Sequence, residues 1–479
     1  MLEDFGALFF FRMRFNQRTE RFVSRMKHGT IDFLHGRILP SLARLALPIM
    51  ATSMVQTAYN LTDMAWIGRV GSQAVTAVGV AGMYTWLSGG IVTLARMGSQ
   101  IKVAHSLGEG KKKEAAVYAA GGLQLTILLA VIFGLITNIF SDQLIGFFGV
   151  NSTEVLVQAK DYLRITCGLI IFTFLNQTIT GIFTAIGDSR TPFAANCAGL
   201  VINMVLDPLL IFGFGPVPAM GTVGAAVATV TAQMAVTLLL VVKAVKDTYL
   251  FSDIHITRRI EKKYFDVILK LGLPSSLQSM LYCGISMVLT KLIAGWGDGA
   301  VAVQRVGGQI ECISWTTAEG FGSAMSAFSG QNFGAKLYDR VKKSYVTAVA
   351  VLFVWGLFTS GLMIFGAEAI FKVFIQEPEV VAIGAGYLVI IGYSQMFMCQ
   401  ELMTVGALQG LGKTFSASVI TIILTGVRIP LAIFLSQTAM GLDGIWWALS
   451  LSSIVKGIIF VGYYGYVLKK LPVRQGTDR

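Results

Sequence analysis

Twelve long apolar runs recur between residues 43 and 468, and this recurrence limits the fold more than any other feature of the chain. Each run is about 20 residues long, which is enough for a helix to cross a bilayer. Only 13% of the 479 residues are charged, whereas soluble domains carry roughly a quarter. The sequence therefore predicts an all-α polytopic membrane protein with twelve transmembrane helices.

The distribution of Lys and Arg predicts the orientation. Of these residues, 29 lie in one set of alternate connections and at the two chain ends, whereas the opposite set holds few, among them Arg69 and Lys372. Because positive charge accumulates on the cytoplasmic side, we expect both termini of this cell-membrane protein to be cytoplasmic. Residues 1–42 are then a basic segment that rests on anionic lipid, and 469–479 a cytoplasmic tail. The predicted helices span residues 43–67, 75–100, 115–139, 161–186, 191–213, 221–244, 266–294, 301–328, 344–366, 383–409, 415–437 and 444–468.

The chain also contains an internal duplication. A shift of 226 residues places the LALP at 45–48 on the LGLP at 271–274, and Gly71 on Gly297. Each unit has six helices, so both units enter the membrane from the same side and enclose a central cleft, which favours alternating access. The expected units are an N-lobe (residues 43–244), a basic cytoplasmic linker (245–265) and a C-lobe (266–468).

The first apolar run contains a carboxylate, Asp63, and a proline, Pro48. A charge at membrane depth costs about 3 kcal/mol on insertion scales and usually marks an ion or proton pathway. Pro48 removes a helical hydrogen bond and permits a kink. The alternative is that Asp63, a few residues before Arg69, lies at a helix end and reaches the interface.

Further polar side chains of the N-lobe extend this prediction. Asn203 and Asp207 are four residues apart and share a helix face, and the next helix adds Thr229. Two carboxylates, an amide and a hydroxyl suit either a hard cation such as Na⁺ or a shared proton. The second lobe has Leu289 where the first has Asp63, so the site belongs to the N-lobe alone. The alternative is a hydrogen-bonded pair at a helix end beside Pro208.

The C-lobe has intramembrane charges of both signs, which favours mutual pairing. Glu401 with Arg428 is the first pair that we expect. In the alternative, Glu311 or Glu401 faces the cleft and attracts a cationic compound. The charges in question are Lys291, Arg305, Glu311, Glu319, Glu401, Arg428 and Lys456.

Other chemistry is not indicated. The five cysteines are isolated and odd in number, and the four histidines have no ligand spacing. There is no nucleotide loop and no compact basic domain behind the net charge of +12. We therefore expect no enzyme activity, no cofactor, no metal beyond Na⁺ at the cation site, and no nucleic-acid partner.

Several stretches together resemble the multidrug and toxic compound extrusion (MATE) family: residues 48–68, GDSRTP at 187–192, NMVLDPLLIFG at 203–213, MGTVGAAVATV at 220–230 and GQNFGA at 330–335. The resemblance covers residues 40–470. It implies a twelve-helix exporter that expels organic, often cationic, compounds in exchange for Na⁺ or H⁺. By position, Asp63, Asn203 and Asp207 resemble the cation-binding residues of the DinF-like branch, and Thr229 is a further match. The expected substrate-cavity residues are Gln56, Tyr59, Tyr162, Asn176 and Met204.

The chain departs from the NorM-like branch, which has a glutamate where this chain has Tyr282, so that branch's C-lobe cation site is not expected. The resemblance favours a multidrug efflux antiporter, acting as a monomer in membrane lipid on small organic molecules. The alternative is a flippase for lipid-linked sugars. A flippase needs a cationic cavity for pyrophosphate, whereas this N-lobe presents Asp63 and Asp207.

Overall fold

The computed structural model describes residues 31–148, 152–213, 215, 218–247, 249–374 and 377–472. Within these ranges the chain forms helices and their connections, without a β-strand. Most of the predicted basic segment at 1–42 and of the tail at 469–479 lies outside the described residues.

The first half of the chain forms eight described helices: α2 (Ile38–Val70), α3 (Ser72–Gly108), α4 (Lys112–Ile139), α5 (Ser141–Gly146), α6 (Thr153–Gly168), α7 (Ile171–Ile186), α8 (Arg190–Ile211) and α9 (Gly221–Lys246). A short 3-10 turn, η1 (Phe251–Asp253), follows in the connection. The second half forms α10 (Lys262–Ala294), α11 (Asp298–Gly334), α12 (Tyr338–Phe365), α13 (Ala367–Lys372), α14 (Pro378–Gly410), α15 (Thr414–Gly426), α16 (Arg428–Ser436) and α17 (Leu442–Lys470).

The predicted membrane helices are confirmed as helical segments, and two of them are interrupted. Among the described residues, ten spans are long and apolar enough to cross a bilayer alone, α15 and α16 counting as one. An eleventh consists of α6 and α7, which meet at a bend of 42°. The twelfth is α11, whose 37 residues suffice to span although it carries several charges. The short α5 and α13 lie between membrane helices and were not predicted.

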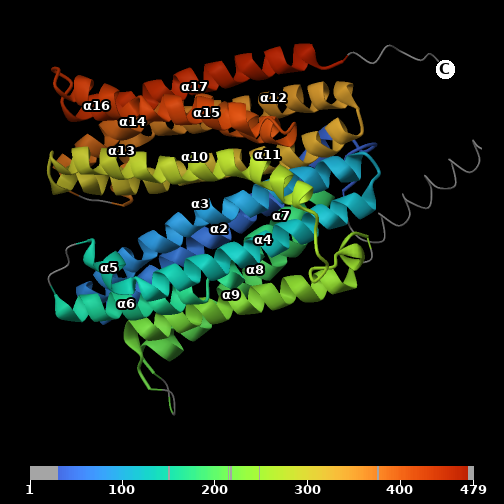
Figure 1. The fold of residues 1–479 in the computed structure, drawn as a ribbon. Coiled ribbons are helices and arrows are strands. Elements are labelled where there is room, and N and C mark those ends of the chain that lie inside the picture. Colours follow the sequence, from blue (N-terminus) through green and yellow to red (C-terminus); the bar gives the residue numbers. More distant parts are fainter. Residues whose placement is uncertain are drawn as a thin grey trace, which may run out of the picture.

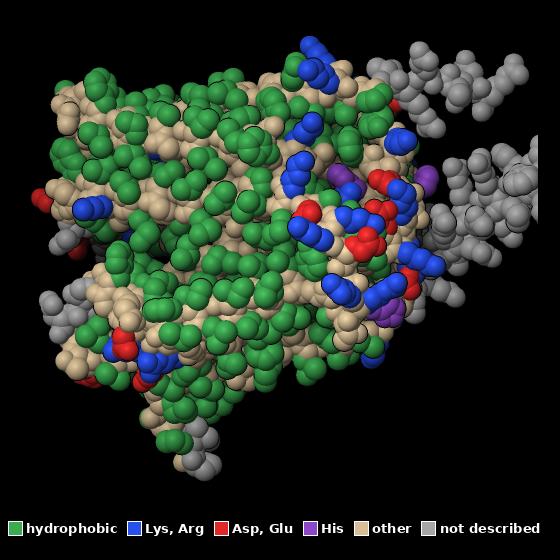
Figure 2. Space-filling model, in the orientation of Figure 1, with side chains coloured by type: hydrophobic (Ala, Val, Ile, Leu, Met, Phe, Trp, Pro, Cys, Tyr) green, Lys and Arg blue, Asp and Glu red, His purple; other side chains and the backbone are tan. Residues whose placement is uncertain are grey.

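The two halves of the chain form two lobes that lie side by side, with their helices running in similar directions (Figure 1). Apolar side chains cover the middle of the visible face, and most of its Lys and Arg residues gather at one end (Figure 2). This end is the one at which α17 finishes (Figure 1). The apolar band and the charged end fit a protein that spans a membrane.

At the charged end the lobes are packed directly against each other. A Cβ added at Gly108 of α3 would clash with the Gln331 carbonyl of α11, and one added at Gly334 of α11 would clash with the His105 carbonyl of α3. His105 of α3 also lies with its Nε2 2.7 Å from the Gly410 carbonyl oxygen of α14. Small residues are therefore needed where the backbones of the two lobes meet.

Toward the opposite end the same helices part. Cβ atoms added at Gly79 of α3, Gly284 of α10 or Gly308 of α11 would have no neighbour within 4 Å. Trp86 of α3 and Ile313 of α11 are each 54% exposed. The lobes therefore enclose a cleft that is closed at the charged end, and Figure 2 shows the halves separating at the other end.

Candidate functional site

Three helices of the N-lobe bring the predicted cation-binding residues together. α2 carries Asp63, α8 carries Asn203 and Asp207, and α9 carries Thr229. Asn203 and Asp207 are fully buried, and the Asn203 amide donates a 3.0 Å hydrogen bond to Asp207 Oδ1. The predicted helix spacing of these two residues therefore does place them in contact, inside a bundle formed by α8 with α2 and α9.

Tyr59 and Tyr162 complete this cluster. The Tyr59 hydroxyl faces Thr229 without reaching hydrogen-bonding geometry, and it lies within electrostatic range of Asp63 and Asp207. Tyr162 of α6 is buried beside the same groups. The structure thus brings together six residues that the sequence analysis named on four different helices.

The oxygen atoms of this cluster are incompletely satisfied. Five buried oxygens have no hydrogen-bond partner among the described residues: Tyr59 Oη, Asp63 Oδ1, Asn203 Oδ1, Asp207 Oδ2 and Thr229 Oγ1. Asp63 and Asp207 interact with each other, and neither forms an ion pair with a described Lys or Arg. Buried polar atoms are normally paired, so this arrangement suits a bound cation with oxygen ligands or a proton shared by the carboxylates.

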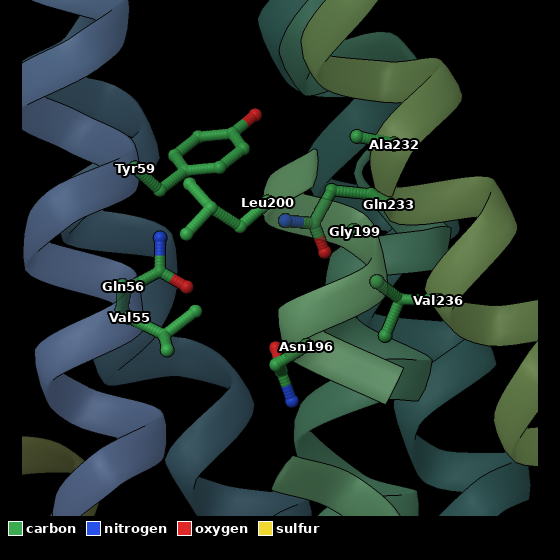
Figure 3. Close-up of a pocket in the computed structure, with 9 residues that line it drawn as sticks. All are labelled: Val55, Gln56, Tyr59, Asn196, Gly199, Leu200, Ala232, Gln233 and Val236. Atoms are coloured by element: carbon green, nitrogen blue, oxygen red, sulfur yellow. The ribbon is translucent and has the colours of Figure 1, made fainter. Parts of the chain in front are cut away.

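A small pocket lies next to the cluster, and Figure 3 shows its lining. Gln56 and Tyr59, both predicted cavity residues, point into it from α2 (Figure 3). Asn176, also a predicted cavity residue, does not line the pocket. Its amide donates a 2.7 Å hydrogen bond to the side-chain oxygen of Gln233, which does. Met204 is 44% exposed and does not line the pocket. The lining residues are Val55, Gln56, Tyr59, Asn196, Gly199, Leu200, Ala232, Gln233 and Val236.

Sequence reasoning missed two polar residues of this pocket, Asn196 and Gln233. A signal for Gln233 was present, because it lies four residues after Thr229 and therefore on the same face of α9. Asn196 has no comparable spacing to the predicted residues, since it lies seven positions before Asn203 and about two turns away on α8. Only the packing of α2 against α8 shows that it reaches the pocket.

The expected pair of Glu401 and Arg428 is wrong. Glu401 of α14 instead accepts a 2.8 Å ion-paired hydrogen bond from Lys456 of α17. Arg428, at the start of α16, donates to the hydroxyls of Ser452 and Ser453 at 3.0 and 2.8 Å. Because α14 packs along α17, the Lys456 ammonium lies next to Glu401. The Arg428 guanidinium is instead satisfied by two hydroxyls of α17.

The remaining polar groups give no sign of other chemistry. Among the described residues, no three His, Cys, Asp or Glu side chains are arranged to hold a metal ion. All five cysteines are free, and Cys167 and Cys399 are buried. Glu311 accepts a 3.2 Å hydrogen bond from Gln395. The N-lobe oxygen cluster is therefore the strongest candidate for an ion site.

Two six-helix lobes around a cleft that is closed at one end only, with a buried carboxylate cluster in one lobe, are the architecture of a membrane transporter. A model of the MatE family matches the chain twice, over residues 48–209 and 274–434. The two matches begin 226 residues apart, at the shift of the predicted duplication. Together they cover more than half of the chain, and the chain belongs to this family.

Known proteins agree with this assignment. The chain is 27% identical to the probable multidrug resistance protein YoeA of Bacillus subtilis, over 90% of this chain and 94% of that protein. It is 28% identical to the probable multidrug resistance protein NorM of Thermotoga maritima, over 85% and 88%. A crystal structure described as MATE in the bent conformation superposes with a TM-score of 0.85 at 23% identity, over 92% of this chain and 97% of that one. The structural match confirms the fold of twelve helices in two lobes.

Proposed function

We propose that this protein is a multidrug efflux transporter that exchanges organic, often cationic, compounds for Na⁺ or H⁺. The observation that supports coupling to an ion is the set of five unpaired buried oxygens around Asp63 and Asp207. Membership of the MatE family and the names of the similar multidrug resistance proteins support the class of substrate. The coupling ion is Na⁺ or H⁺, because either one satisfies the same oxygens.

The proposed arrangement follows the predicted units. The N-lobe (43–244) holds the ion through Asp63, Asn203, Asp207 and Thr229, and the C-lobe (266–468) moves against it. Small organic molecules enter from the cleft between the lobes. The transporter acts as a monomer in the cell membrane, with both termini and the 245–265 linker in the cytoplasm.

Ion binding and compound binding are expected to exclude each other in the N-lobe. Tyr59 belongs both to the oxygen cluster and to the pocket lining. An ion that draws Asp63 and Asp207 together also shifts the Tyr59 hydroxyl, because this group interacts with both carboxylates. A ligand in the pocket and an ion at the cluster thus compete through one side chain, which is the requirement for exchange.

The flippase alternative is not favoured by the site. A lipid-linked sugar presents a pyrophosphate, which needs Lys or Arg in the cavity. The pocket instead contains amides and a phenol, and its neighbours are carboxylates. An acidic wall repels such a substrate and attracts a cation.

The test is gradient-driven uptake of a fluorescent cation into inverted vesicles that contain wild type, Asp63→Asn, Asp207→Asn or the double variant at matched protein levels. Each single variant should lose ion-driven uptake by about tenfold or more, because hydrogen bonds to a charged group are worth about 1.5–3 kcal/mol. The double variant should be scarcely worse than either single one, since groups that act as a unit are not additive.

Separate Na⁺ and pH gradients identify the ion in the same vesicles. The matched control is Asp142→Asn, which removes an exposed carboxylate that pairs with Lys160 outside the cluster; it should transport normally. Full gradient-driven uptake in Asp63→Asn would refute the assignment, and additive losses in the double variant would indicate two separate sites.

A further inference from the structure

Two charged side chains, one from each lobe, lie toward the closed end of the cleft. Arg96 lies on α3 and Glu319 on α11, and each lies within electrostatic range of the other. They do not form an ion pair within 4.0 Å. The sequence marked Glu319 only as one of several C-lobe charges, and neither residue belongs to the N-lobe oxygen cluster.

The helix register places this pair where the lobes begin to separate. Glu319 lies eleven residues before Gly330, about three turns, so both share one face of α11. Gly330 packs against Ala104 of α3, whereas Glu319 is exposed. On α3, Met97 and Trp86 continue the face of Ala104 toward the open end, and their exposure rises from 7% to 54%. The accessible part of the cleft therefore ends near Glu319.

The two side chains also reach a common depth. Measured along the helix axes toward the open end, at 1.5 Å per residue, the Cα atom of Arg96 lies about 12 Å and that of Glu319 about 17 Å from the contact of Ala104 with Gly330. Helical side chains tilt toward the N-terminus of their helix, and the N-terminus of α3 is at the open end. α11 also begins at the open end, so both side chains lean that way, and the longer Arg96 side chain spans the remaining difference of about 5 Å in height.

Beside Arg96 is a second donor without a partner. Arg96 Nε and Gln100 Nε2 are both buried, and neither has a hydrogen-bond partner in the part of the chain that the structure describes. They lie one turn apart on α3, and both side chains pack against Gly181 of α7. A buried donor that stays unpaired costs about 1–3 kcal/mol. Two such donors next to each other indicate a place for an acceptor group that arrives with a ligand.

We propose that Arg96, Gln100 and Glu319 form a substrate subsite for zwitterionic organic compounds. A carboxylate of the compound accepts hydrogen bonds from Arg96 and Gln100, and its amine or iminium group lies against Glu319. The proposal specifies a class of substrate, and it rests on the proposed export function.

The charges explain why a zwitterion fits better than an ion of either sign. Arg96 repels a compound that is only cationic, and Glu319 repels one that is only anionic. A compound with both groups satisfies the donors of the N-lobe and the carboxylate of the C-lobe at once. It also contacts both lobes at once.

The experiment compares two dyes that differ by one methyl ester: rhodamine 110 has a free carboxylate, and rhodamine 123 is its methyl ester. Binding to the purified full-length protein in nanodiscs is measured by fluorescence anisotropy. In Arg96→Gln, the affinity for rhodamine 110 should fall about tenfold relative to that for rhodamine 123, the loss of one charge-assisted hydrogen bond. Glu319→Gln should weaken the binding of both dyes, because both carry the cationic ring system.

Two further variants make the result specific. Arg96→Lys keeps the positive charge and should retain part of the preference for rhodamine 110. Lys102→Gln removes another positive charge of α3, one that lies over the Tyr118 ring, and should leave both affinities unchanged. An affinity ratio that is the same in Arg96→Gln as in wild type overturns the subsite, whether both affinities fall or neither does. Binding of rhodamine 123 to wild type separately tests the proposed export function.

Discussion

Glu401 and Lys456 form a buried ion pair in the C-lobe, with side chains only 5% and 4% exposed. Such a pair is not strong evidence for stability, because removing two charges from water costs several kcal/mol. Breaking it is costly, since the remaining charge stays buried without a partner. The pair therefore acts mainly by fixing how α14 and α17 meet.

Glu401→Gln should lower the stability of the purified protein by about 3–5 kcal/mol, because it leaves the Lys456 ammonium unpaired. The measurement is the midpoint of thermal unfolding in detergent. Glu401→Gln combined with Lys456→Met should recover most of the loss. The control Glu368→Gln, which breaks an exposed pair with Lys372, should change the midpoint little. If the double variant is as unstable as the single one, pairing is not the source of the loss.

At the scale of single residues, the sequence predicted groups whose relation lies within one helix. Asn203 and Asp207 were found because four residues make one turn, and Asp63 because a charge in an apolar run stands out. Partners on different helices were not predictable. Lys456 lies 55 positions from Glu401 in the chain, and Arg96 and Glu319 lie in different lobes. Both interactions depend on how the helices pack, which the spacing of residues in the sequence does not reveal.

At the scale of helices, apolar length located the spans but not their internal breaks. The junction of α6 and α7 near Leu169 has no Pro or charge beside it that marks a break, and the one at Val427 was not recognised although Arg428 and Pro430 follow it directly. A hydropathy window averages over about 20 residues and does not respond to a local bend. Helices also extend past the apolar run: α3 continues to Gly108, beyond the predicted end at residue 100.

α2 links the N-lobe oxygen cluster to the opposite lobe. It carries Tyr59 and Asp63, and its Met50 packs against Gly320 of α11. Pro48 lies two residues before this contact, and the helix continues through it. Since Pro48 cannot donate a backbone hydrogen bond, α2 is most easily bent between its C-lobe contact and its first residue, Ile38.

Pro48→Ala restores the missing donor and should therefore stiffen α2. We expect export of a fluorescent cation to fall by half or more while the amount of protein in the membrane stays normal. Pro274→Ala, at the equivalent position of α10, is the matched control, because its lobe has Leu289 in place of Asp63; it should have the smaller effect. Unchanged efflux in Pro48→Ala would mean that bending at this position has no part in transport.

At the scale of the whole molecule, the duplication was the most informative feature of the sequence. It predicted two lobes, and the two matches to the MatE family repeat at the same spacing. The state of the cleft was not predictable. Closure at one end depends on contacts between lobes, such as that of His105 with Gly410, which lie more than 300 positions apart in the chain.

The asymmetry of charge makes the orientation testable. The connection between the lobes is the longest basic loop, and it packs against the N-lobe: Lys112 pairs with Asp253 at 2.9 Å, and the Gln124 amide donates to the Ile256 carbonyl at 2.5 Å. Positively charged loops stay on the cytoplasmic side. We therefore expect the packed end of the cleft to be the cytoplasmic end, and the cleft of this structure to open outward.

A short epitope tag inserted between Asp247 and Ile256 should therefore be reached by antibody only after the cells are permeabilised. A tag between Phe148 and Ser152, in a connection at the opposite end, should be labelled in intact cells and serves as the matched control. Both tagged proteins must still export the fluorescent cation, so that labelling reports a folded transporter. Labelling of the first tag in intact cells would reverse the orientation, and the cleft of this structure would then open to the cytoplasm. If both tags were labelled in intact cells, the odd number of membrane spans that we expect between the two tags would itself be wrong.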